Sequence, residues 1–168
     1  MSPELSAVVV VGPLRERAGE CLRSLLDQGL GERLEVVVVD LAGGGALPVP
    51  GGEDPAVRVL ESPPSTTFPQ ARARGLRAAR GAVVAFVEEH AVAFPGWAEA
   101  LLAAHRGPYA GVGPAVVNGN PGVGSSDIEG LLACSRSARL PSMPALAAWR
   151  AVCARLVARR SGKALASR

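Results

Sequence analysis

The sequence predicts an α/β fold in which helices cover both faces of a mainly parallel sheet, giving three layers. Four short apolar runs, rich in valine, have the length of strands and occupy residues 7–11, 34–39, 56–60 and 82–87. Such continuous β-branched runs are expected of parallel strands that are buried on both faces. Amphipathic stretches separate the runs in the order strand, helix, strand, strand, helix, strand. This order is typical of a doubly wound sheet.

Size and composition limit the class of protein. A chain of 168 residues is long enough for one domain with a sizeable core, alone or with a tail. Hydrophobic residues make up 48% and charged residues 20%, which favours a folded domain over a disordered chain. The net charge is only +3 and aromatic residues are 4% of the chain, so nucleic-acid binding is not expected.

The cysteines and the apolar segments predict a cytoplasmic protein. Cys21, Cys134 and Cys153 are odd in number and widely spaced, and they form neither a metal-binding pair nor a disulfide framework. A reducing compartment is the simpler interpretation. The first apolar run is too short for a secretory signal, and no stretch has the length of a transmembrane helix.

The chain before residue 70 contains one candidate ligand-binding residue. Gly12 and Pro13 end the first strand, and apolar residues at helical spacing predict a helix over 15–28. Asp40 then closes the second strand. It has two interpretations of equal weight: an acceptor for a sugar hydroxyl or base N–H, or a residue that stabilises a turn.

The stretch 70–97 is the richest in potential ligands. A small-residue helix carries Arg72 among four arginines, and Gly81 separates it from a strand that leads into Glu88, Glu89 and His90. Strand ends are where ligands bind in open α/β sheets. If the chain stays extended, Glu88 and His90 share one face, where they could bind manganese or magnesium with diphosphate oxygens. The alternative, favoured by local chemistry alone, is a solvated strand end.

The remaining chain is predicted to contain a helix that carries Trp97 to His105, a strand over 109–117 and a basic helix over 145–160. We expect a domain over residues 1–125 and a helical appendage over 126–168. The basic helix is expected to pack on the sheet or on a partner in a homodimer, and an anionic membrane surface is the less favoured alternative.

The sequence lacks the motifs of several kinds of functional site. GPLRERAG after the first strand lacks the spaced glycines of a dinucleotide fingerprint, and no Gly-Lys-Ser/Thr follows the GGG after Asp40. The chain has two histidines, and neither stands in a motif for nucleophilic catalysis.

Taken together, the segments resemble a family 2 glycosyltransferase of the GT-A fold. The resemblance covers about residues 6–121 and consists of AVVVVG, CLRSLLDQ, LEVVVVD, QARARGLRAARGAVVAFVEEH, the PGW helix and YAGVGPAVVN, in that order. It implies a GT-A-like nucleotide-diphospho-sugar transferase fold with a helical C-terminal segment. It also implies a nucleotide-diphosphate sugar as the ligand, a hexosyltransferase type of activity and a divalent metal, manganese or magnesium.

The resemblance assigns roles to individual residues. Asp40 matches the acidic residue that contacts the nucleotide base, and Arg72 matches an arginine on the nucleotide side. Glu88, Glu89 and His90 occupy the position of the Asp-x-Asp motif, where Glu88 and His90 would bind the metal and the two glutamates would bind substrate.

Two features depart from the family pattern. The first turn reads GPLRE where the family has a polar turn, and Asp127 and Glu129 lie in no general-base motif. The catalytic residue is therefore unassigned. The alternative function is that of a catalytically degenerate homologue that acts as a binding or assembly module.

Overall fold

The computed structural model describes residues 2–13, 15–42, 48–63, 65–108 and 111–114. The chain divides into two compact units, residues 1–103 and 104–168. The fold described below is that of the first unit.

The first unit is built on a sheet of four strands. The strands are β1 (Leu5–Val11), β2 (Leu34–Asp40), β3 (Val57–Glu61) and β4 (Val83–Glu88). They lie in the order β3-β2-β1-β4, and every neighbouring pair is parallel. The predicted parallel α/β sheet is confirmed, with strand bounds that move by two residues at most.

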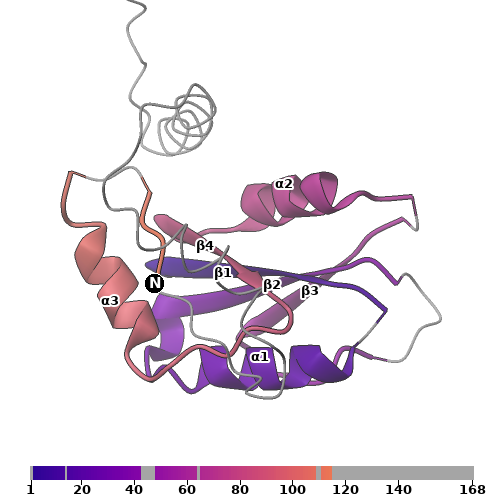
Figure 1. Ribbon diagram of the computed structural model, residues 1–168, viewed down its shortest axis with the longest axis horizontal. Helices are drawn as coiled ribbons and strands as arrows, with labels where there is room; N and C mark the ends of the chain where they lie inside the picture. The colour runs from indigo at the N-terminus through magenta and orange to yellow at the C-terminus, as the bar shows by residue number, and fades with distance from the viewer. Residues whose placement is uncertain (1, 14, 43–47, 64, 109–110, 115–168) are drawn as a thin grey trace, which may run out of the picture. The chain divides into compact units, whose positions relative to one another are not determined.

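Two helices cover the two faces of this sheet. Helix α1 (Glu16–Leu26) lies on one face and α2 (Phe68–Ala78) on the opposite face, as Figure 1 shows. A 3-10 turn, η1 (Gly31–Arg33), leads into β2, and α3 (Trp97–Ala104) follows β4 on the face of α1. The predicted three layers are therefore present.

The alternation of side chains along β1 divides the core between the two faces. Leu5, Val9 and Val11 join the cluster that includes α1 and α3, whereas Val8 and Val10 belong to the two clusters on the face of α2. Side chains of a strand point alternately to opposite faces, so one valine-rich run supplies both cores. This explains why the run is continuous rather than alternating.

The strand β4 is less buried than the sequence predicts. It pairs only with β1 among the described strands and therefore lies at an edge of the sheet that these strands form. Its side chains are partly buried or exposed, and Phe86 is 47% exposed. The apolar run over 82–87 predicts a strand correctly, but it does not distinguish a central strand from an edge strand.

A capping interaction and a close contact set the position of α2. The backbone N–H of Thr67, the N-cap residue, donates to Oε1 of Gln70 over 2.8 Å. Gly75 lies so close to β1 that a Cβ atom in its place would collide with Val8. The absence of a side chain at Gly75 therefore lets α2 lie against the sheet, and Arg72 is carried on the same helix.

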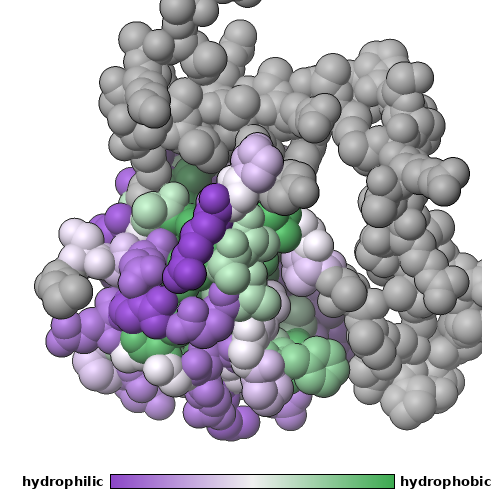
Figure 2. Space-filling model, turned by 90° about the vertical axis from the view of Figure 1, so that its left-hand side faces the viewer, coloured by the Kyte–Doolittle hydropathy of each residue, from purple (hydrophilic) through white to green (hydrophobic). Residues whose placement is uncertain are grey.

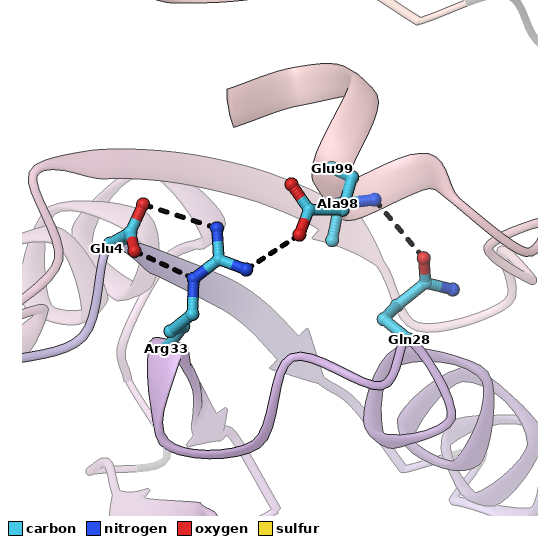
Figure 3. Close-up of polar contacts among 5 residues, drawn as sticks. All are labelled: Glu4, Gln28, Arg33, Ala98 and Glu99. Atoms are coloured by element: carbon cyan, nitrogen blue, oxygen red, sulfur yellow. Dashed lines mark hydrogen bonds and ion pairs between the residues drawn. The ribbon is translucent and has the colours of Figure 1, made fainter. Parts of the chain in front are cut away.

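Polar contacts fasten the start of α3 to the segments before β1 and β2. Arg33 pairs with Glu4 over 2.7 Å and with Glu99 over 2.6 Å, and both acceptors raise the pKa of the guanidinium. Gln28 accepts a hydrogen bond from the backbone N–H of Ala98 over 3.1 Å (Figure 3). Seen from the left-hand side of Figure 1, the described surface has hydrophilic residues beside apolar ones (Figure 2).

Three predictions concern residues that lie wholly or partly outside the described ranges. Residues 111–114 of the strand predicted over 109–117 are described, and they are not in a strand. The basic helix over 145–160 and the domain boundary at residue 125 lie outside the described residues, and both stay predictions. Within the described part of the chain, no helix has both the length and the apolar character needed to cross a membrane.

Candidate functional site

The carboxyl ends of the four strands bring most of the predicted site residues to one edge of the sheet. Because all pairs are parallel, Asp40 at the end of β2 lies opposite Val11 at the end of β1, and Glu88 at the end of β4 lies opposite Val10. Asp40 and Glu88 therefore flank the end of β1 from its two sides. This is the edge at which open α/β sheets bind ligands.

Asp40 forms a buried ion pair with Arg15. The Nη2 atom of Arg15 lies 2.6 Å from Oδ2 of Asp40, and the two side chains are only 10% and 8% exposed. The other carboxylate oxygen, Oδ1, accepts a hydrogen bond from the backbone N–H of Ala42 over 2.9 Å. Asp40 thus stabilises the turn after β2, as one of its two interpretations requires, and it also holds an arginine at the sheet edge.

Arg72 and Glu88 form a second ion pair, between α2 and the end of β4. Their side chains are 45% and 50% exposed, so both groups are accessible to a ligand. An exposed pair of this kind contributes little to stability. The arginine predicted to reach a phosphate and the glutamate predicted to bind a metal are therefore in contact with each other.

Glu89 points to the end of β1 rather than to solvent. Its Oε2 atom accepts a hydrogen bond from the backbone N–H of Gly12 over 2.7 Å. On the same side, the thiol of Cys21 donates to the backbone carbonyl of Glu88 over 3.4 Å. Burial raises the pKa of Cys21 to about 12, with smaller contributions from the charges of Glu89 and Glu88.

His90 does not continue the strand. The strand β4 ends at Glu88. Glu89 and His90 then form a turn, in which the backbone N–H of Ala91 donates to the carbonyl of Glu88 over 2.9 Å. The strand geometry that would have put Glu88 and His90 on one face is therefore absent. The side chain of His90 is exposed.

The metal-binding prediction has limited geometric support. The described ranges hold no group of three or more His, Cys, Asp or Glu side chains arranged to bind a metal ion. Glu88 and His90 have suitable chemistry for manganese or magnesium, but they would supply two ligands only. An ion at this edge needs further oxygen ligands from a bound molecule such as a diphosphate.

The loop that follows His90 is held by α1 and by the turn after it. The Oγ atom of Ser24 accepts a hydrogen bond from the backbone N–H of Ala93 over 3.0 Å. The side chain of Gln28 donates to the carbonyl of Phe94 over 3.1 Å. It also accepts from the backbone N–H of Ala98 at the start of α3 (Figure 3). These contacts fix the exit of the chain from the candidate site.

Two residues of this edge, Arg15 and Gly12, are missing from the set predicted from the sequence. Both belong to the turn GPLRE, to which the sequence analysis assigns no ligand-binding role. An arginine in the turn after one buried strand and an aspartate at the end of the next are a signal for their pairing only once the two strands are known to be neighbours. Asp127 and Glu129 lie outside the described residues.

Comparison with known proteins identifies the family of this chain. The model of Glycosyl transferase family 2 matches residues 14–129. No curated protein matches the chain.

Solved structures show the same fold. Residues 1–349 of TarS from S. aureus are similar with 23% sequence identity and a TM-score of 0.51, over 61% of this chain and 33% of that one. The same fragment in complex with UDP-GlcNAc gives 23% identity and a TM-score of 0.51, over 61% of this chain and 32% of that one. The chain thus spans about a third of the length of these TarS structures. The predicted GT-A-like fold is supported by this likeness, and the family match shows that the chain belongs to glycosyltransferase family 2.

Proposed function

We propose that this chain binds a nucleotide-diphosphate sugar at the carboxyl edge of its sheet and transfers the sugar to an acceptor hydroxyl. The observation that carries the proposal is the position of Asp40, Arg72 and Glu88 around the end of β1 in a family 2 domain. In this proposal Asp40 contacts the nucleoside and Arg72 contacts the diphosphate. The S. aureus TarS structure in complex with UDP-GlcNAc makes UDP-sugars the first donors to test.

The charges at this edge suit a diphosphate leaving group. Arg72 is half exposed and can pair with phosphate oxygens in place of Glu88. A guanidinium group donates paired hydrogen bonds to phosphate oxygens as it does to carboxylate oxygens. Glu88 and His90 would then hold a divalent metal together with the diphosphate. Such an ion, when bound, neutralises charge that develops on the leaving group.

A binding or assembly module without catalysis is the alternative. Its support is that three carboxylates of the site are already engaged by protein donors: Asp40 by Arg15, Glu88 by Arg72 and Glu89 by Gly12. An inverting transfer needs a carboxylate that is free to accept the proton of the attacking hydroxyl. We assign no residue to that role.

Calorimetric titration with UDP-, GDP- and dTDP-sugars, with and without manganese, tests donor binding. Binding of one of these donors is the expected result, and binding of none would overturn the proposal. Release of the free nucleoside diphosphate in the presence of candidate acceptors then distinguishes the two functions. A transferase releases it faster when an acceptor hydroxyl is supplied, whereas a binding module retains the intact donor.

A further inference from the structure

A row of three hydrogen-bonding side chains runs along the end of α1 and the turn that follows it. Cys21, Ser24 and Gln28 stand at positions i, i+3 and i+7 of CLRSLLDQ, a segment that contains no predicted ligand-binding residue. Residues at this spacing lie on one face of a helix. All three side chains form hydrogen bonds with the same stretch of chain, residues 88–98. This face of α1 therefore supports the segment that begins at the carboxyl end of β4.

Ser24 holds the middle of this segment. Its hydroxyl donates to the carbonyl of Cys21, one turn back on its own helix, over 2.7 Å. The same oxygen accepts a hydrogen bond from the backbone N–H of Ala93 over 3.0 Å. Because the hydroxyl proton is used within the helix, the oxygen is left to act as an acceptor. The orientation of Ser24 is thus set by α1 and not by the segment that it holds.

Gln28 holds the same segment at two later points. Its amide nitrogen donates to the carbonyl of Ser24 over 2.9 Å and to that of Phe94 over 3.1 Å. Its amide oxygen accepts from the backbone N–H of Ala98 over 3.1 Å, which gives an N–H group in the first turn of α3 its acceptor (Figure 3). The amide therefore joins the end of α1 both to the loop after β4 and to α3.

These contacts fix the backbone of the segment and leave its ligand-binding side chains free. The row reaches only carbonyl and N–H groups of residues 88–98, so it uses neither the carboxylate of Glu88 nor the imidazole of His90. The side chain of Glu88 is half exposed and that of His90 is exposed. A segment with a fixed backbone loses less conformational entropy when its side chains bind a ligand.

We infer that Ser24 and Gln28 are positioning residues of the donor site, which hold the backbone of residues 88–98 in place before a donor binds. This inference rests on the proposed function and adds to it a role for the segment CLRSLLDQ. Neither residue needs to touch the donor. Loss of either one should lower donor affinity, because the donor must then order the segment as it binds, while the sheet keeps its fold.

Calorimetric titration of Ser24→Ala and Gln28→Met with UDP-, GDP- and dTDP-sugars, in the presence of manganese, tests the inference. For the donor that the wild-type protein binds, we expect each variant to lose about 3- to 10-fold in affinity, the factor that corresponds to one neutral hydrogen bond. Ser24→Thr keeps the hydroxyl and should bind as the wild type does. Arg33→Gln is the matched control, because it loosens α3 at Glu99, next to Ala98, and should keep the wild-type affinity (Figure 3).

Hydrogen exchange provides a second readout, which does not depend on affinity. The backbone N–H of Ala93 should exchange faster in Ser24→Ala than in the wild-type protein, and that of Ala98 should exchange faster in Gln28→Met. Addition of the donor should slow both again. If Gln28→Met unfolds, Gln28→Glu keeps an acceptor for Ala98, loses the donor to Phe94 and should show the same loss of affinity.

Other outcomes overturn the inference. Wild-type donor affinity in Ser24→Ala or in Gln28→Met would show that this residue does not prepare the site. An equal loss of affinity in Arg33→Gln would assign the effect to a looser α3. Unchanged exchange of Ala93 in Ser24→Ala would show that the bond does not hold the backbone. A wild-type protein that binds none of these donors would contradict the proposed function itself.

Discussion

The carboxylate of Glu89 accepts a hydrogen bond from the backbone N–H of Gly12 over 2.7 Å. The bond joins the end of β4 to the turn after β1, across 77 positions of the sequence. Glu89 is therefore a positioning residue of the candidate site. It keeps the turn that contains Arg15 next to the strand end that contains Glu88.

Loss of this bond should destabilise the fold. Glu89→Ala removes a charged acceptor from a partly buried N–H, and we expect the free energy of unfolding to fall by about 1–3 kcal/mol. Glu89→Gln keeps an oxygen acceptor and should lose less. Urea denaturation of both variants provides the measurement, and His90→Ala, next along the chain and exposed, is the control. An unfolding free energy of Glu89→Ala equal to that of the control would show that the bond is dispensable.

Much of this edge can be predicted from the sequence, because it depends on local patterns. Valine-rich runs mark the strands, and the polar residue that ends each run marks the carboxyl edge, as at Asp40 and Glu88. The buried ion pair of Arg15 with Asp40 joins residues 25 positions apart, and it depends on which strands are neighbours. Strand order is a property of the whole sheet, so the local pattern does not contain it.

The conformation at the end of β4 is not predictable from the run of polar residues. Glu88, Glu89 and His90 follow an apolar strand in sequence, but a hydrogen bond from Ala91 to Glu88 turns the chain before His90. The sequence pattern does not predict the edge position of β4 for a related reason. Its valines fit a central strand equally well, and only the strand order shows that one side of β4 has no partner among the described strands.

The effect of manganese on donor binding should depend on Glu88 and His90. Glu88→Ala or His90→Ala should abolish the effect of manganese on the calorimetric titration of the donor, because each removes one of two protein ligands. Glu20→Ala, an exposed carboxylate change on α1, is the control and should keep the effect. Titrations of Glu88→Ala and His90→Ala that match the control would show that neither residue is a ligand.

Gly75 should resist replacement by alanine although it lies inside a helix. Alanine favours a helix by about 1 kcal/mol over glycine, but its Cβ atom would collide with Val8, which is buried in β1. Overpacking of a core costs about 1–3 kcal/mol, so we expect net destabilisation of Gly75→Ala in thermal or urea unfolding.

A double-mutant cycle separates this collision from a general loss of stability. Val8→Ala alone should destabilise the fold by creating a cavity, but it also removes the methyl group that the new Cβ would meet. The combination Val8→Ala with Gly75→Ala should therefore be more stable than the sum of the single changes predicts. Additive effects would show that the cost of Gly75→Ala does not come from the contact with Val8.

Alkaline pH should destabilise the fold through Cys21. Burial holds the pKa of this thiol at about 12, above its ordinary value near 9, so the native state keeps the proton that the unfolded state loses. The contribution of Cys21 to stability is therefore complete below pH 9 and decreases as the pH rises toward 12, by up to about 1.4 kcal/mol per pH unit. Cys21→Ala should be less stable at pH 7, because it leaves a small cavity, but its unfolding free energy should decline less between pH 9 and 11. Equal slopes for the two proteins in urea unfolding over this range would show that Cys21 does not titrate differently in the folded state.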